Sequence, residues 1–452
     1  MLAFGSSLED DLVLAPFDVA CSRAHVAALQ GGGIIDAHTA QSLERALQRV
    51  EFEITSGVFA DAARAHGAED VHGAIDARVR AFEPSAGERL HAGRSRNDQV
   101  ATTLLLYVGD RAMRGTELCE RIARFALRCA LDALGTQTLL AATTHWQPAQ
   151  PMLLALWFEA IAENFARAAR RLARVAQDAR ASCPLGSGAC TGSTLPLDRA
   201  AAAAQLGFAA PSRNALDAVG DRDVALDLLH ALARALVAAS RVSEECVIYC
   251  TPAFGYARPD DAISTGSSLM PQKRNPDPFE LVRAAAGSTI GTLTGALTTV
   301  AGVALSYHRD LQETKALVIR GTERALVTLE AFERAFAGLS WNAAAMDAAA
   351  ERGYTIATDV ADALIARGVT ARRAHHLVGA AVSAAEAAGR PLGADDLIAL
   401  ARSAGVEGLD APLDARASVQ AKRTSGSTHP DAIRRAILEL EAELDARAEV
   451  SA

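Results

Sequence analysis

Five long stretches of the chain carry apolar residues at the spacing of an α-helix, and this pattern limits the possible folds more than any other feature of the sequence. They cover about residues 100–134, 152–181, 221–250, 278–306 and 310–339. Helices of this length each have one apolar face to bury, and packing side by side buries it. The sequence therefore predicts an all-α fold with a central five-helix bundle.

Shorter helical patterns flank the predicted bundle. On the N-terminal side they are separated by turn signals such as Gly31-Gly32-Gly33 and lie at residues 18–30, 36–54 and 69–83. On the C-terminal side they are separated by glycine-bearing turns and lie at residues 354–367, 371–388, 394–404 and 430–447. We expect three helical domains, over residues 1–94, 95–348 and 349–452.

Composition agrees with helices that pack through small side chains, since 50% of the residues are hydrophobic but only 5% are aromatic. The formal net charge of -9 gives no field that favours nucleic acid or an acidic membrane. The seven cysteines form no C-x-x-C pair and no metal-binding spacing. No signal peptide is expected from the N-terminal residues, so we expect a cytoplasmic protein with reduced thiols.

The segment over residues 284–307 contains no charged side chain, and Gly287, Gly291 and Gly295 recur in it at every fourth position. Its length alone would allow it to cross a bilayer. However, it is rich in Gly, Ser and Thr, which is typical of helices in close contact with other helices. We therefore expect no membrane span, and a helix buried against other copies of the same chain.

Residues 266–280, with the sequence GSSLMPQKRNPDPFE, form a polar loop that leads into a helix. Gly266 gives the backbone freedom at the entry, and three prolines restrict the later part of the loop. Asp277 is expected as the N-cap of the following helix and Glu280 as its third residue. Such a loop presents polar groups and buries little.

Two other segments place polar groups at helix ends or in loops. In HAGRSRND, residues 91–98, Ser95 and Asp98 could be a plain capping pair, but two arginines oppose the helix dipole and are better placed for an anion. His145 lies in a predicted loop, TTHWQPAQP, where a lone histidine is often only structural. GSGACTG at 186–192 has the wrong glycine spacing for a dinucleotide site.

Several of these segments resemble a known family. Residues 266–276 match the G-S-S-x-M-P-x-K-x-N-P signature of the fumarase/aspartase superfamily of lyases. HAGRSRNDQV at 91–100 and SYHRDLQETK at 306–315 resemble the argininosuccinate lyases within it. The resemblance, which extends from about residue 11 to about residue 435, implies cleavage of argininosuccinate to arginine and fumarate in arginine biosynthesis, with no metal or organic cofactor.

The resemblance also implies roles for individual residues. Ser267 is the general base, Lys273 its electrostatic support, and His145 the acid that protonates the leaving nitrogen. Glu280 supports His145, although it could equally be a capping residue only. The implied substrate contacts are Ser22, Ser95, Arg96, Asn97, Thr144, Arg222, Asn275, Tyr307, Gln312 and Lys315.

Because these motifs lie on different long helices or at their ends, one subunit has difficulty bringing them together. The resemblance implies a homotetramer in which three chains contribute to each site. Two alternatives stay open: another fumarate-releasing lyase that acts on a different amine, or a non-catalytic tetramer of the kind found among lens crystallins. The joint presence of His145, Ser267, Lys273 and Glu280 favours an enzyme.

Overall fold

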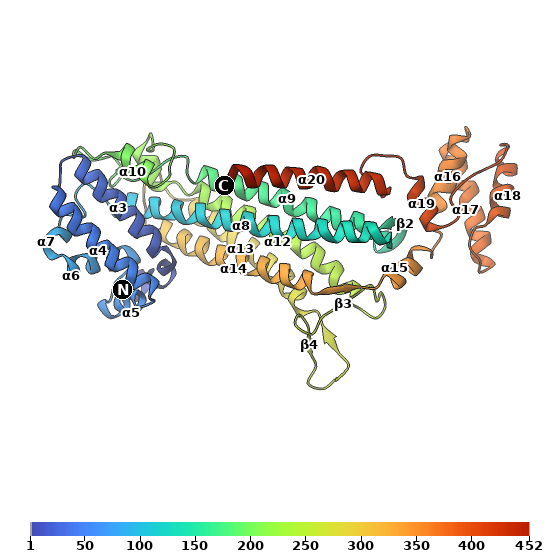
Figure 1. The fold of residues 1–452 in the computed structure, drawn as a ribbon, viewed down its shortest axis with the longest axis horizontal. Coiled ribbons are helices and arrows are strands. Elements are labelled where there is room, and N and C mark those ends of the chain that lie inside the picture. Colours follow the sequence, from blue (N-terminus) through green and yellow to red (C-terminus); the bar gives the residue numbers. More distant parts are fainter. Residues whose placement is uncertain (1, 452) are drawn as a thin grey trace. The chain divides into compact units, whose positions relative to one another are not determined.

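The computed structural model describes residues 2–451. The predicted all-α class is confirmed, since the described residues form α-helices joined by loops and only three small sheets of two strands each. The predicted long helices are α8 (Arg96–Thr136), α9 (Leu154–Asp178), α12 (Asp223–Tyr249), α13 (Asp277–Val300) and α14 (Leu311–Ala337), all labelled in Figure 1. The helix predicted over residues 278–306 ends earlier, at Val300, and a loop follows it.

The chain divides into two compact units, each made of three segments. Unit 1 comprises Met1–Cys119, Ala168–Ser240 and Val282–Glu330, and unit 2 comprises Glu120–Arg167, Arg241–Leu281 and Ala331–Ala452. Every long helix contributes residues to both units. The division into domains 1–94, 95–348 and 349–452 stays a prediction.

Unit 1 contains the N-terminal helices, and two of them closely match the predicted stretches 18–30 and 36–54. Asp36 caps the second of these by accepting a hydrogen bond from the Thr39 amide at 2.7 Å. The elements are α1 (Leu2–Gly5), α2 (Leu8–Asp11), the 3-10 helix η1 (Leu12–Leu14), α3 (Ala15–Gly31), α4 (Ala37–Thr55), α5 (Phe59–His66), α6 (Val71–Phe82), α7 (Pro84–Gly87), α10 (Arg199–Gln205) and α11 (Ala215–Gly220).

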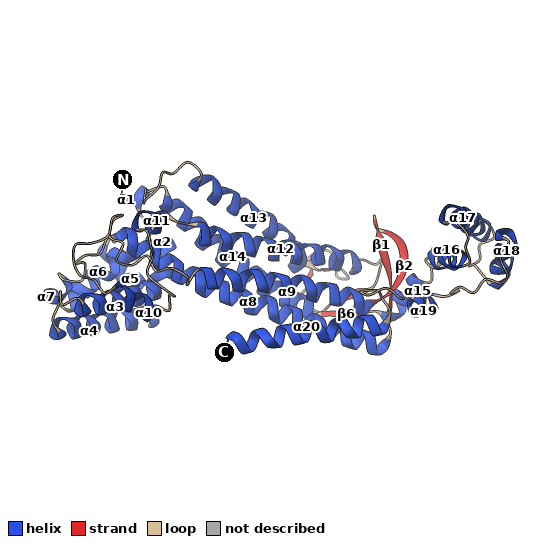
Figure 2. Cartoon of the chain, turned by 90° about the horizontal axis from the view of Figure 1, so that it is seen from above, coloured by secondary structure: helices blue, strands red, loops and turns tan. Residues whose placement is uncertain are grey.

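Unit 2 contains the strands and the C-terminal helices. Its antiparallel strand pairs, drawn in red in Figure 2, are β1 (Leu139–Thr144) with β2 (Gln147–Leu153), β3 (Ala257–Pro259) with β6 (Leu339–Trp341), and β4 (Thr265–Gly266) with β5 (Arg274–Asn275). Its helices are α15 (Ala343–Ala350), α16 (Ala357–Ala366), α17 (Ala371–Ala387), α18 (Ala394–Ala404), α19 (Ala415–Ala421) and α20 (Pro430–Ser451). The buried ring of Phe332 stacks between those of Phe165 and Phe336, at 5.4 and 5.6 Å.

One face of α13 is left uncovered by the rest of the chain. Ile290 is 45% exposed and Leu297 50% exposed. A Cβ atom added at Gly287 or Gly291 would meet no atom within 4 Å, whereas one at Gly295 would lie 3.6 Å from Leu317 of α14. Two of the three glycines thus face outward, and the third faces the chain's own neighbouring helix.

Among residues 2–451 a single helical stretch, Leu8–Gly31, is long and apolar enough to cross a membrane. It is divided among α2, η1 and α3, and 61% of its apolar window is buried. Asp11 and Asp18 lie within it as fully buried carboxylates. The stretch is therefore part of the packed interior of unit 1.

The carboxylate of Asp18 joins three helices of unit 1. Its Oδ1 atom accepts hydrogen bonds from Nδ1 of His72 on α6 at 2.9 Å, and from Nε2 of Gln99 and Oγ1 of Thr103 on α8 at 2.7 and 3.3 Å. Burial alone would raise the pKa of Asp18, but His72, Arg94 and Gln99 outweigh it and lower the pKa to about 2. The ionised carboxylate is thus stabilised by folding.

The lowered pKa of Asp18 predicts a specific dependence of stability on pH. The folded pKa lies below the unfolded value, so the stabilisation is present above about pH 4 and is lost as the pH falls toward 2. A shift from 3.8 to about 2, at about 1.4 kcal/mol per pKa unit, amounts to about 2–3 kcal/mol. We expect Asp18→Asn to be less stable at pH 7 and to approach the wild type in acid, as measured by urea unfolding down to the lowest pH at which both proteins fold.

The matched control is Asp362→Asn, which changes an exposed carboxylate on α16. Its stability should differ little from that of the wild type at every pH. If the Asp18→Asn difference at pH 7 persisted unchanged in acid, the charge of Asp18 would not be the source of the stabilisation.

Candidate active site

The loop that carries Ser267 is held at its base by the short β4–β5 sheet. Thr265 pairs with Asn275, and Gly266 pairs with Arg274. The Thr265 hydroxyl donates to the carboxylate of Asp277, and Arg274 forms an ion pair with Asp261. The ends of the loop are therefore fixed, while the part between them projects from unit 2 (Figure 1).

Within this loop the Ser267 hydroxyl oxygen accepts two backbone hydrogen bonds. The donors are the amides of Leu269 at 3.2 Å and Met270 at 3.0 Å. Donors aimed at a hydroxyl oxygen favour its deprotonated form, because they stabilise negative charge on that atom. Lys273 lies in the same loop and is exposed, and Leu269 is 84% exposed, so the loop buries little, as its sequence predicts.

His145 lies at the tip of a β-hairpin, which corrects the expectation that residues 143–151 form a loop. β1 and β2 pair from Leu139 with Leu153 to Thr144 with Gln147, and His145 and Trp146 form the turn. Their φ angles are 54° and 60°, in the left-handed region that two-residue hairpin turns usually fill with asparagine and glycine. Two bulky residues in this region store strain, which is common at functional sites.

The environment of His145 within a single chain is open. His145 and Thr144 are both exposed, and no other residue in the described part of the chain hydrogen-bonds to the imidazole. Figure 1 also shows the loop that carries β4 at a place separate from β2, although both belong to unit 2. Within one chain, therefore, the hairpin that carries His145 and the loop that carries Ser267 are separate segments (Figure 1).

Glu280 is exposed on the first turn of α13. The helix begins at Asp277, which was expected to be the N-cap, so the boundary lies one residue earlier than predicted. The Asp277 carboxylate bonds to the Thr265 hydroxyl across the loop base. The acidic residues at 277 and 280 both suit the positive end of the helix dipole.

In unit 1, Ser95 precedes α8 and forms the predicted capping pair with Asp98. The Asp98 Oδ1 atom accepts the Ser95 amide at 3.0 Å, and the Ser95 hydroxyl accepts the Asn97 amide at 3.2 Å. Asp98 Oδ2 also accepts the amides of Gly186 and Gly188, both at 2.9 Å. Burial raises the pKa of Asp98, and the three amides oppose this effect.

The segment 186–192 thus contacts Asn97 and Asp98 at the start of α8 through its backbone. The side-chain amide of Asn97 donates to the carbonyl of Ala189 at 2.9 Å in the same segment. Gly186 and Gly188 have φ angles of 84° and 62°, which a residue with a side chain rarely adopts. The segment therefore fixes the start of α8.

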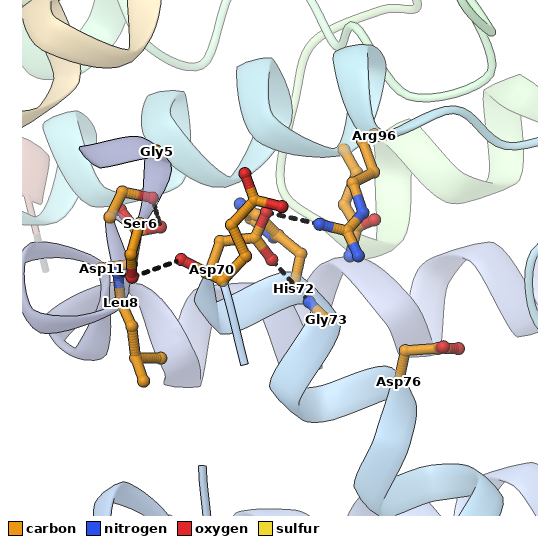
Figure 3. Close-up of polar contacts among 12 residues, drawn as sticks. Gly5, Ser6, Leu8, Asp11, Asp70, His72, Gly73, Asp76 and Arg96 are labelled. Carbon is orange, nitrogen blue, oxygen red and sulfur yellow. Dashed lines mark hydrogen bonds and ion pairs between the residues drawn. The ribbon is translucent and has the colours of Figure 1, made fainter. Parts of the chain in front are cut away.

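Arg96 and Ser22 each have a charged or polar partner in unit 1. Arg96 Nη1 lies 2.5 Å from Asp70 Oδ2, and Asp70 Oδ1 caps α6 by accepting the Gly73 amide at 2.7 Å (Figure 3). The buried Ser22 hydroxyl accepts from Arg94 Nη1 at 3.0 Å. Both contacts connect the N-terminal helices to the segment just before or at the start of α8.

Arg222 is 3% exposed, and only one nitrogen of its guanidinium group bonds to protein. Nη1 donates to the carbonyl of Asp221 at 2.6 Å, whereas Nε and Nη2 have no partner among the described residues. Burial lowers the pKa of Arg222 to about 10, with the Tyr307 phenol nearby. A buried cation with free N–H groups is suited to an anionic partner.

Gln312 and Lys315 contact the N-terminal segment of unit 1. Gln312 Nε2 donates to the carbonyl of Gly5 at 2.9 Å. Lys315 Nζ lies 2.7 Å from Asp11 Oδ1, and both side chains of this ion pair are buried. In this structure the two side chains thus hold residues 5–11 in place. If they also bound substrate, the same amide and ammonium groups would serve both purposes.

The structure divides the implied residues between the two units. Ser22, Ser95, Arg96, Asn97, Arg222, Tyr307, Gln312 and Lys315 belong to unit 1, whereas Thr144, His145, Ser267, Lys273, Asn275 and Glu280 belong to unit 2. The sequence patterns did not identify Asp11, Asp18, Asp70 and His72. Asp11 pairs with Lys315, Asp70 pairs with Arg96, and Asp18 bonds to His72. The available signal was an aspartate on the apolar face of a predicted helix, as at Asp18, because a buried carboxylate needs a partner.

Comparison with known proteins agrees with these motifs. Residues 7–291 match a family model described as lyase, and residues 354–420 match one described as argininosuccinate lyase C-terminal. An argininosuccinate lyase of Thermus thermophilus is 38% identical over 98% of this chain and 95% of its own length. Another, from Anaeromyxobacter sp. (strain K), is 42% identical over 87% of this chain and 83% of its own length.

A solved structure extends the likeness to the fold. The crystal structure of EDDS lyase in complex with formate is 26% identical, with a TM-score of 0.83, over 98% of this chain and 88% of that chain. Full-length similarity at about 40% identity to named argininosuccinate lyases, together with the two family models, establishes the relationship. This chain therefore belongs to the argininosuccinate lyase family.

Proposed function

We propose that the protein cleaves argininosuccinate by β-elimination, releasing arginine and fumarate, with Ser267 as the general base. The observation that carries this proposal is the pair of amides, from Leu269 and Met270, that donate to the Ser267 oxygen. A serine hydroxyl is too weakly acidic to act as a base unless its negative charge is stabilised. The two amides and the positive charge of Lys273 supply that stabilisation.

The reaction requires three groups to act at neighbouring atoms of the substrate. Ser267 removes a proton from the carbon next to a carboxylate, and the electron pair left behind is held as an aci-carboxylate facing Lys273 and Asn275. That pair then forms the carbon–carbon double bond as the carbon–nitrogen bond breaks. His145 gives a proton to the departing guanidino nitrogen, with Thr144 beside the substrate and Glu280 supporting the imidazolium.

Unit 1 binds the substrate in this proposal. Arg96 and Arg222 supply guanidinium groups for carboxylates, and the two free nitrogens of Arg222 support its role. Ser22, Ser95, Asn97, Tyr307, Gln312 and Lys315 are the further contacts proposed on the basis of the family resemblance. The cytoplasm is the proposed location, because seven cysteines without any pairing motif suit a reducing compartment.

We further propose that the working form is a homotetramer whose sites each draw on three chains. The open environment of His145 and its separation from the Ser267 loop within one chain both support shared sites. The uncovered, uncharged face of α13, with Ile290, Gly291 and Leu297 exposed, supplies a surface for other copies. Burying such a face stabilises assembly through apolar contact.

The activity is tested by incubating the protein with argininosuccinate and following the absorbance of fumarate, with arginine measured as the second product. We expect Ser267→Ala to lower turnover by about 10²–10⁴-fold, as is typical when a positioned general base is lost. The fold should be unaffected, because the loop is exposed. Equilibrium binding of argininosuccinate should persist, since Ser267 is not among the proposed binding groups, most of which lie in unit 1.

The matched control for this experiment is Ser268→Ala, which removes the same atom from the next residue of the same loop. We expect it to keep most of the activity. Normal turnover by Ser267→Ala, or inactivity of Ser268→Ala alone, would mean that the base is assigned to the wrong residue. Failure to release fumarate from argininosuccinate would instead favour a lyase for another amine.

Glu280→Gln separates the two interpretations of Glu280. Glutamine keeps the shape of the first turn of α13 but lacks the negative charge that supports an imidazolium. We expect turnover to fall by about tenfold or more with little loss of stability, the melting temperature being measured by calorimetry beside the fumarate assay. A lower melting temperature with normal turnover would leave only the capping role.

Gly291→Leu tests the proposed assembly without disturbing the fold of one chain. A side chain at Gly291 meets no atom of its own chain within 4 Å, so the subunit should still fold. We expect sedimentation to show smaller species and the activity to fall with them. The control is Gly379→Leu on α17, a helical glycine with equally open surroundings. A tetrameric Gly291→Leu, or a fully active monomeric wild type, would contradict the proposal.

A further inference from the structure

The β1–β2 hairpin that presents His145 has little to stabilise it internally. It consists of two strands only, and isolated two-stranded hairpins are marginally stable. Pro148 and Pro151 lie in β2 and donate no backbone hydrogen bonds, and the register shifts between Ala142 and Thr143. The orientation of the hairpin must therefore be set by contacts outside it.

Apolar packing supplies some of these contacts, since Leu140 and Ala141 of β1 are buried, but the polar contacts lie at the base of the hairpin, opposite the tip. The Leu139 amide, at the start of β1, donates to Asp347 Oδ1 at 2.7 Å. Asp347 Oδ2 pairs with Arg416 Nη2 at 2.8 Å, and Arg416 Nη1 donates to the carbonyl of Gln137 at 2.9 Å. Asp347 belongs to α15 and Arg416 to α19, and Figure 2 shows both helices beside the hairpin.

The other strand has its own anchor. The Leu153 amide, at the end of β2, donates to the Thr428 hydroxyl at 2.7 Å. Gln137, whose carbonyl Arg416 holds, has a φ angle of 50°, so the chain enters the hairpin through a left-handed residue. The direction in which β1 leaves α8 thus depends on the backbone conformation of Gln137. Arg416 bonds to the carbonyl of Gln137, and Asp347 bonds to the amide of Leu139 two residues later.

We propose that Asp347 and Arg416 are positioning residues, which set the place of the His145 imidazole by holding the base of its hairpin. The inference rests on the proposed function, in which His145 is the acid. Neither residue touches the substrate. Nothing in their own chemistry is used in the reaction, and their effect passes through the backbone of Gln137 and Leu139.

The length of the hairpin makes the position of its tip sensitive to its base. From Leu139 to Thr144 it extends about 17 Å, at roughly 3.3 Å per residue. A tilt of about 10° at the base moves the tip by about 3 Å. A displacement of about 1 Å from the reacting geometry can lower a rate by about 10²-fold. A small loss of restraint at Asp347 is therefore enough to remove His145 from its place.

The same pair should contribute little to overall stability. The side chain of Arg416 is 51% exposed and that of Asp347 34% exposed, and ion pairs of this kind add little to the free energy of unfolding. A positioning role therefore predicts that turnover and stability separate when the pair is removed. A purely structural role predicts that they change together or not at all.

The test compares Asp347→Ala, Asp347→Asn and Arg416→Met with the wild type. We expect Asp347→Ala and Arg416→Met to lower kcat by about tenfold or more and to change KM for argininosuccinate less than kcat, because Thr144 is the one proposed substrate contact on β1 and most of the others lie in unit 1. Asp347→Asn keeps an oxygen that accepts from the Leu139 amide, so its kcat should lie within about threefold of the wild type. The double variant Asp347→Ala/Arg416→Met should lose hardly more than either single variant, since both act on one restraint.

Asp362→Ala is the matched control, since it removes an exposed aspartate from the neighbouring α16. It should leave kcat unchanged. A kcat for Asp347→Ala within about twofold of the wild type would overturn the proposal. So would a kcat loss in Asp347→Asn as large as that in Asp347→Ala, because the hydrogen bond to Leu139 would then not be the restraint.

Hydrogen exchange across residues 137–153 separates failure of this inference from failure of the proposed function. We expect Asp347→Ala to speed exchange in the hairpin, while exchange in α9 and α12 stays as in the wild type. If the wild type released no fumarate, the proposed function would be wrong. Faster exchange confined to the hairpin would still show that Asp347 restrains the base of the hairpin. Unchanged exchange in the hairpin of Asp347→Ala would overturn the positioning role, whatever its turnover of argininosuccinate.

Discussion

Unit 1 depends on one buried carboxylate, that of Asp18. A buried charge is costly unless several donors face it, and here His72, Gln99 and Thr103 supply them from two other helices. The bonds to Oδ1 of Asp18 thus join α3, α6 and α8 at one point. Because Ser22 lies one turn further along α3, and Ser95 and Asn97 lie at the start of α8, the same interaction places the proposed binding residues relative to one another.

The proposed catalytic residues of unit 2 lie on two segments that are arranged differently from the binding residues of unit 1. The Ser267 loop and the His145 hairpin both extend from the helices, and each is fixed at its base and open at its tip. The bases are held by polar side chains, Asp277 and Arg274 for the loop and Asp347 and Arg416 for the hairpin. Rigid helices therefore define where each segment begins, while the reactive groups stay accessible to a substrate.

The sequence was sufficient to predict the long helices, because apolar periodicity over many residues depends only on local spacing. It was not sufficient for the hairpin, since Pro148 and Pro151 hide the strand pattern of β2 and the partners that hold it lie far along the chain. Ion pairs such as that between Asp11 and Lys315, which are 304 residues apart, leave no local signal either. The motifs around Ser267 and Ser95 could be recognised, but the interactions that hold them could not.

The way Asp98 and Asn97 hold the segment 186–192 has a consequence for protein engineering. All three bonds that Asp98 and Asn97 form with that segment go to its backbone: the amides of Gly186 and Gly188 and the carbonyl of Ala189. A Cβ atom at Gly186 or Gly188 would lie 2.7 Å from Arg199 or from the carbonyl of Gly192, so these two positions admit no other residue without rearrangement. The exposed side chains at positions 189 and 191 take no part in the bonds. A designer could therefore vary them, to attach a label or to retune the surface beside residues 95–97, without altering the support of α8.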